Sequence, residues 1–151
     1  MKPKRKKILL YVVLPLFVVM AAGGFYFYKE YNRVHKDTAK LKPDYILKAA
    51  DLVREFEANE QASYKKYQDK VILINGVIKQ LEKDDKGFYS VVLGDTSSMS
   101  SVRCSIDSLH NKEAAEVQQG STIAVKGICT GFNADELLGS DVILTRSVVN
   151  K

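Results

Sequence analysis

The second half of the chain alternates apolar and polar residues in short runs. From Val71 onward, apolar side chains recur at every second position, which is the period of a β-strand with two different faces. Polar segments rich in glycine, aspartate and serine separate five such runs. The predicted strands cover residues 71–81, 88–95, 101–106, 121–132 and 141–149.

Two helices are predicted around these strands. Between residues 44 and 68, apolar and aromatic side chains recur at intervals of three and four, and Pro43 with Asp44 supplies a start signal. This amphipathic helix should dock on the sheet or at the mouth of a barrel, and a helix that binds a partner protein is the alternative. A shorter helix is predicted over residues 111–118, between the third and fourth strands.

Gly76 and Gly127 each stand in the middle of an otherwise strong strand. Glycine weakens a strand interior, because it has more backbone entropy to lose and no side chain to pack. In a small closed barrel, however, a residue without Cβ permits a sharp bend and a close approach across the interior. We therefore predict a mainly β fold, a five-stranded OB-fold barrel with a preceding amphipathic α-helix, in preference to an open sheet.

Residues 8–28 form an uncharged, strongly apolar run. A helix of this length would extend roughly 31 Å, which matches the hydrocarbon core of a bilayer. The run predicts a single-pass transmembrane helix, and a cleaved signal peptide is the alternative because basic residues precede it and small residues lie within it. Five Lys or Arg residues precede the run and three closely follow it, which predicts a cytoplasmic N-terminus and a periplasmic or extracellular C-terminal domain at the cytoplasmic membrane.

Charge is distributed unevenly between the predicted parts of the chain. These parts are a basic tail and anchor (1–28), a polar spacer (29–43) and a helix plus OB-fold domain (44–151). Residues 1–36 hold eight of the 23 Lys and Arg side chains and one of the 18 acidic side chains, so residues 37–151 keep 15 basic and 17 acidic ones. The high isoelectric point therefore belongs to the anchor, and the net charge of the domain does not argue for a nucleic-acid partner.

In an OB-fold, ligands lie across the second and third strands, between the first and fourth interstrand loops. Phe88 could stack on a base or a sugar ring, and Arg103 could meet a phosphate or a carboxylate. Ordinary strand surface is the alternative for each position. The predicted ligand-binding residues are Phe88, Ser90, Val92 and Arg103 on the strands, with Lys83, Lys86, Phe132 and Asn133 at the loops.

The remaining reactive side chains do not form a recognisable catalytic pattern. Cys104 and Cys129 are the only cysteines, and they could form a disulfide or be two small buried residues. His110 lies in a predicted loop without a nucleophile beside it in the sequence. No metal-binding spacing, phosphate-binding loop or hydrolase motif occurs, so we expect neither an enzyme nor a metal or cofactor.

Residues 50–150 resemble the bacterial tRNA_anti-like OB-fold family. The resemblance lies in the segments 59–78, 91–93, 102–104, 120–131 and 141–147, and in the residues Asn59, Glu60, Lys66, Tyr67, Lys70, Gly76, Cys104, Gly127 and Cys129. It implies an OB barrel behind an N-terminal helix in an exported, membrane-attached protein. Members of the family often carry a lipoprotein cysteine, whereas this chain has the apolar run instead.

The resulting hypothesis is a membrane-anchored, extracytoplasmic OB-fold binding module. Residues 8–28 would bind the membrane, and the partner at the cell envelope would be a protein or a glycan. The alternatives are an oligonucleotide-binding protein and a structural or assembly component of an envelope complex, because a fold alone does not decide a function.

Overall fold

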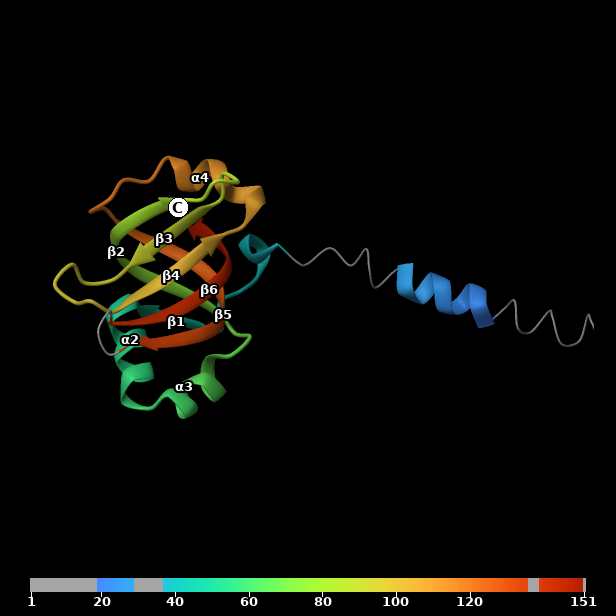
Figure 1. The fold of residues 1–151 in the computed structure, drawn as a ribbon, viewed down its shortest axis with the longest axis horizontal. Coiled ribbons are helices and arrows are strands. Elements are labelled where there is room, and N and C mark those ends of the chain that lie inside the picture. The colour runs from blue at the N-terminus through green and yellow to red at the C-terminus, as the bar shows by residue number, and fades with distance from the viewer. Residues whose placement is uncertain (1–18, 29–36, 136–138, 151) are drawn as a thin grey trace, which may run out of the picture. The chain divides into compact units, whose positions relative to one another are not determined.

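The computed structural model describes residues 19–28, 37–135 and 139–150 (Figure 1). The chain divides into two compact units, Met1–His35 and Lys36–Lys151. In the first unit, residues 19–28 are helical, and the rest of the predicted span lies outside the described residues. Among the residues that are described, no helix combines the length and the apolar character that crossing a membrane requires.

The second unit contains one mixed sheet of six strands. The five predicted strands are all present, and an additional short strand precedes them. Neighbouring strands follow the order β1-β2-β3-β4-β6-β5, and a further pairing of β2 with β5 closes the last five into a ring. The strands are β1 (Tyr45–Lys48), β2 (Val71–Lys83), β3 (Tyr89–Leu93), β4 (Ser101–Ile106), β5 (Thr122–Asp135) and β6 (Gly139–Asn150).

The strand β2 is long enough to belong to both sides of the ring. Its residues 71–77 pair with β5, and the pairing with β3 begins at Ile78 and runs to Lys83. The edge of β2 that pairs with β3 from Ile78 onward pairs with β1, in parallel, at residues 72–75. The partner on this edge therefore changes around Gly76, where β1 has ended and β3 has not yet begun.

Gly127 allows β5 and β6 to approach each other closely. Lys126 pairs with Val148 and Ile128 with Thr145, so two residues of β6 lie opposite Gly127. A Cβ at Gly127 would overlap the Ser147 hydroxyl and lie only 3.0 Å from the Cβ of Leu144. The expected close approach at this glycine is confirmed, and it coincides with a bulge in β6.

Gly76 has a different neighbour from the one that a barrel interior suggests. A Cβ at this position would lie 3.0 Å from the Cβ of Ala49, the first residue of the helix α2 (Ala49–Ala58), and 3.3 Å from that of Leu93. The register shift in β2 falls later, between Ile78 and Gln80. The absence of a side chain at Gly76 therefore lets the first residue of α2 pack directly against β2.

The predicted helix over residues 44–68 is wrong in its extent. Its first residues form β1, and the remainder forms two helices, α2 (Ala49–Ala58) and α3 (Glu60–Tyr67). Asn59 interrupts them with an extended backbone, and its side chain accepts a hydrogen bond from the Ala62 N–H at 3.0 Å, which caps α3. Ile46 was expected on the buried stripe but is 64% exposed, because it lies in the strand.

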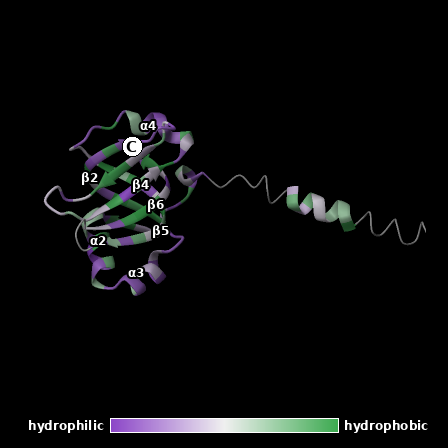
Figure 2. Ribbon diagram, in the orientation of Figure 1, coloured by the Kyte–Doolittle hydropathy of each residue, from purple (hydrophilic) through white to green (hydrophobic). Residues whose placement is uncertain are grey.

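Helices cover the two ends of the ring (Figure 1). α2 and α3 lie at one end, and α4 (Asn111–Ala115), which follows the short 3₁₀ helix η2 (Ser108–His110), lies at the other. Leu52 and Phe56 of α2 and Ala114 of α4 are buried in the same core as the inward side chains of the strands. Figure 2 shows apolar residues concentrated on the strands and polar ones on α3 and α4.

Residues 37–43 were predicted as spacer, but they pack on the domain. Thr38 begins the 3₁₀ helix η1 (Thr38–Lys40) and is buried, and the Lys126 ammonium donates hydrogen bonds to the carbonyls of Ala39 and Leu41 at 2.7 and 2.9 Å. Because Lys126 is itself buried, these carbonyls compensate the desolvation of its charge. These contacts attach the start of the described segment to the domain, in the same compact unit.

His110 holds the same segment from the other side. Its Nε2 lies 3.0 Å from Asp37 Oδ1, and its Nδ1 lies 3.4 Å from Glu113 Oε1. Burial alone would lower the pKa of His110, but the two carboxylates outweigh it and raise that pKa above its ordinary value. The contacts of His110 are those of a structural ion pair.

We predict that Gly127→Ala destabilises the domain by about 1–3 kcal/mol, because the added methyl group forces β6 away at the bulge. Gly131→Ala is the matched control in the same strand, since its Cβ would meet nothing closer than 3.8 Å. Urea unfolding of the full chain in detergent, followed by circular dichroism, measures both. Equal effects of the two substitutions would contradict the role assigned to Gly127.

Candidate functional site

The structure brings three of the predicted ligand-binding residues together on the outer face of the ring. Ser90 and Val92 of β3 alternate with inward residues, and Val92 pairs with Arg103 of β4. Val92 is only 5% exposed, whereas Ser90 and Arg103 are half-buried. We call the outward row of Glu82, Ser90, Val92, Arg103 and Asp141 the strand face.

Arg103 is held between two carboxylates on this face. Its Nη1 lies 2.6 Å from Glu82 Oε2, and its Nη2 lies 3.5 Å from Asp141 Oδ2. Asp141 also accepts a hydrogen bond from the Ser101 hydroxyl. With one cation and two anions, the cluster carries a formal charge of about −1, so it repels a phosphate group.

The turn between β2 and β3 presents Phe88 at one end of the strand face. Asp84 organises the turn by accepting hydrogen bonds from the N–H groups of Lys86 and Phe88 at 3.0 and 2.7 Å. Phe88 is 42% exposed, so its ring is available to a ligand. The Lys83 ammonium instead lies over the Tyr89 ring, 5.3 Å from its centroid.

Phe132 and Asn133, which were expected together at the last loop, lie in different surroundings in the structure. β5 continues to Asp135, so Phe132 is inside a strand and points inward, where it stacks on Phe56 with ring centroids 5.0 Å apart. This packing on Phe56 separates Phe132 from the outward row that contains Arg103. Asn133 is exposed and pairs with Asp141, which places it beside the strand face.

Cys104 and Cys129 are buried free thiols. Each pairs with Leu144 of β6, from opposite sides, so two strand spacings of roughly 5 Å separate them. That separation exceeds the Cα distance of about 7 Å that a disulfide tolerates. Burial raises the pKa of Cys104 to about 12 and that of Cys129 to about 11, so both remain protonated thiols at neutral pH.

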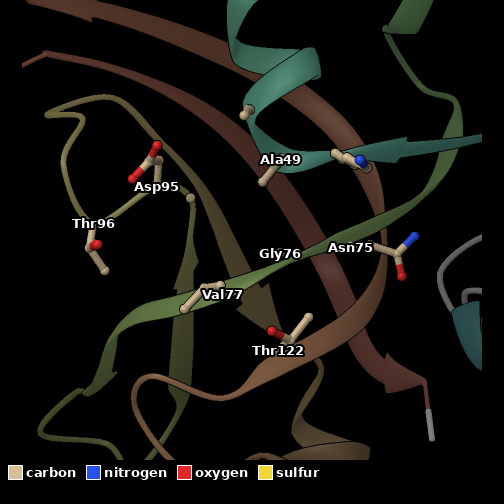
Figure 3. A pocket seen from close by; sticks show the side chains of 10 residues that line it. Ala49, Asn75, Gly76, Val77, Asp95, Thr96 and Thr122 are labelled. Carbon is tan, nitrogen blue, oxygen red and sulfur yellow. The ribbon is translucent and has the colours of Figure 1, made fainter.

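A cavity of about 380 Å³ opens where the edge of β2 changes partners (Figure 3). Figure 3 shows Ala49 above the strand, Val77 and Thr122 below the opening, and Asp95 with Thr96 at its side. The cavity is lined by Lys48, Ala49, Ala50, Asn75, Gly76, Val77, Gly94, Asp95, Thr96 and Thr122. Its volume is in the range of about 300–1,000 Å³ that is usual for small-ligand sites.

Sequence analysis did not identify this cavity, because its lining comes from four separate segments. The one local signal was Gly76, whose missing side chain lets Ala49 sit against β2. A second cavity of about 210 Å³ shares Ala50, Gly94 and Asp95 with the first. Within the described ranges, no three His, Cys, Asp or Glu side chains are grouped so that they could hold a metal ion.

The order of the ring strands and the helix between β4 and β5 define the class of this protein as an OB-fold. The model of the tRNA_anti-like family matches residues 1–146. The chain belongs to that family. No curated protein matches the sequence.

Solved structures are similar to this chain at low sequence identity. One is a lipoprotein from Klebsiella pneumoniae described as a candidate nucleic acid-binding protein, with 16% identity, a TM-score of 0.55, and coverage of 79% of this chain and 100% of that one. Another is asparaginyl-tRNA synthetase from Pyrococcus horikoshii, with 17% identity, a TM-score of 0.40, and coverage of 57% of this chain and 21% of that one.

The two phenylalanines first grouped at the site should differ in their effect on stability. We expect Phe132→Ala to cost about 2–4 kcal/mol, because it removes a ring packed on Phe56. Phe88→Ala should change stability by no more than about 0.5 kcal/mol, because that ring projects from a turn. Thermal unfolding of the two variants side by side checks this, and a larger loss for Phe88→Ala would contradict the placement of both rings.

Proposed function

We propose that this protein is a membrane-anchored, extracytoplasmic OB-fold binding module whose partner is a polypeptide or a glycan of the cell envelope. One observation carries the proposal. Arg103, the cation at the centre of the strand face, is already paired with Glu82 and Asp141. A face of this kind suits a ligand without a phosphate backbone.

A phosphate that approached Arg103 would compete with two carboxylates already in place and would lie close to both. Nucleic-acid binding generally depends on several unpaired Lys and Arg side chains that release counterions, together with stacked aromatic side chains. Phe88 is a single exposed ring beside the strand face, which favours a non-nucleic ligand.

Oligonucleotide binding is the second candidate function. It is supported by the turn that carries exposed Phe88 next to Lys86, and by the name of the Klebsiella pneumoniae lipoprotein with the same fold. In this alternative, a base would stack on Phe88, and the two carboxylates would have to release Arg103.

Membrane anchoring through residues 8–28 is the other part of the proposal. It is supported by the uncharged length of that run and by the excess of Lys and Arg before it. The helical conformation of residues 19–28 is compatible with it. The single-pass topology would place the OB-fold domain outside the cytoplasm.

The first test compares oligonucleotide affinity before and after Arg103 is released. The full chain in detergent should bind a fluorescent oligothymidylate of about 12 nucleotides only weakly, even at about 50 mM salt. The double variant Glu82→Gln/Asp141→Asn should bind it at least about 10-fold more tightly, because Arg103 then lacks competing anions. Fluorescence anisotropy measures both.

Asp51→Asn/Glu60→Gln is the control, because it makes the same change in charge on α2 and α3. Submicromolar binding by the unaltered chain that weakens steeply with salt would overturn the proposal in favour of the oligonucleotide alternative.

The second test concerns topology. Alkaline phosphatase fused after Lys151 should be active in a bacterial host, because this reporter requires an oxidising compartment. Deletion of residues 8–28 should abolish the activity, and a tag before Met1 should stay with the membrane fraction. An inactive fusion would contradict the topology, and loss of the tag from the membrane would indicate a cleaved signal peptide.

A further inference from the structure

The two cavities form one groove, which is separate from the strand face. They share Ala50, Gly94 and Asp95, and they run between the first turns of α2 and the loop from β3 to β4. The larger part is bounded by small and aliphatic residues of α2 and β2 such as Ala49 and Val77. None of the residues of the strand face lines either part.

Hydrogen bonds fix the loop that forms one wall of the groove. The Lys79 ammonium donates to the carbonyls of Ser98 and Ser100 at 2.7 and 3.2 Å. The Ser100 hydroxyl in turn accepts from the Ser140 N–H at 3.0 Å, which ties the loop to the start of β6. The wall is therefore preformed, and a ligand would not have to order it.

Two carboxylates of the groove keep one oxygen available. Asp95 Oδ1 accepts from the N–H and the hydroxyl of Ser97 at 2.9 and 2.8 Å, and Glu57 Oε1 accepts from the Ser100 hydroxyl at 2.6 Å. The second oxygen of each has no hydrogen-bond partner in the described part of the chain. The Ser97 hydrogen bonds lower the pKa of Asp95, which keeps it ionised at neutral pH.

The Lys79 ammonium lies near enough to help lower the pKa of Asp95, but it donates its hydrogen bonds to the loop carbonyls. Arg54 lines the smaller cavity and has no ion pair with either carboxylate in the described part of the chain. Its side chain is 76% exposed, and its ion pair is a long one of 3.7 Å to Asp51. Lys48 lines the larger cavity only, and Glu57 lines the smaller one only. The smaller part of the groove consequently favours a cationic ligand group, and the larger part favours an aliphatic one.

We propose that this groove binds an extended polypeptide segment that places an aliphatic side chain in the larger cavity and a Lys or Arg side chain against Asp95 and Glu57. The inference rests on the proposed function in that the partner is a polypeptide. The two carboxylates disfavour a phosphate-bearing ligand. Among the described residues that line the groove, none is aromatic, so the stacking surface that sugar rings commonly use is missing.

The test uses the ¹⁵N-labelled full chain in detergent micelles and the peptide acetyl-Ala-Leu-Ala-Lys-Ala-amide. We expect the amide resonances of Ala50, Gly94 and Asp95 to shift on titration. Acetylation of the lysine side chain should weaken binding at least about 10-fold, because it removes the cation. The double variant Asp95→Asn/Glu57→Gln should weaken it similarly, whereas the control Asp85→Asn/Glu60→Gln should not.

A second variant tests the aliphatic part without altering charge. Ala50 is exposed in the first turn of α2, so Ala50→Leu should fold normally and fill the larger cavity. We expect this substitution to weaken binding of the leucine-containing peptide at least about 10-fold. An unchanged affinity would overturn the proposed seating of the side chain, and the spectrum itself reports whether each variant is folded.

The outcomes separate this inference from the proposed function. Peptide-induced shifts confined to the strand face would overturn the groove as the site while supporting a polypeptide partner. Groove shifts caused by an N-acetylglucosamine oligomer but not by the peptide would replace the polypeptide with a glycan. No shift with either probe at millimolar concentration would overturn the inference, and strand-face shifts with an oligothymidylate would overturn the proposed function as well.

Discussion

The pairing of β5 with β6 in the ring depends on a close approach at Gly127. No side chain fits between this residue, Leu144 and Ser147, and two residues of β6 are accommodated opposite one of β5. On its other edge, β6 pairs with β4 in parallel register over residues 141–144, directly before the bulge. The strands of the ring enclose the core, which α2 and α4 cover at its two ends.

The same ring decides which charges meet on its outer surface. Glu82, Arg103 and Asp141 come from three different strands, and the registers of those strands place them in contact. Each side chain of the pairs is about one third exposed, so the ion pairs contribute modestly to stability. In the proposed function their larger effect would be on recognition, because they occupy the central cation of the face.

The sequence predicted the strands, whose apolar residues recur at every second position. It failed for segments whose structure is decided by pairing with distant parts of the chain. All five strands were identified because their alternation reflects one buried face. Tyr45–Lys48 was predicted as helix because its spacing continues the helical pattern, yet pairing with residues 72–75 makes it a strand. Phe132 was predicted as the last residue of a strand and grouped with the loop residues, because the end of β5 carries no strong local signal, whereas the pairing with β6 continues to Asp135.

The site illustrates the same limit. Ser90, Val92 and Arg103 were placed together correctly, since neighbouring strands of a hairpin share a face. The ion pairs of Arg103 with Glu82 and Asp141 could not be predicted in the same way, because they depend on the register of three strands. The groove could not be predicted from local sequence either, because α2, β2, β5 and the loop after β3 all contribute residues to it.

The docking of residues 37–43 has a mechanical consequence. A pull on the chain from its amino-terminal side is first resisted at Asp37 by His110 and then by the Lys126 ammonium, before any strand is loaded. β1 comes next and runs parallel to β2, so the load would act along the strands and shear several hydrogen bonds together. Tension applied at the amino-terminal side would therefore act on these contacts and on β1 before it reached the strands of the ring.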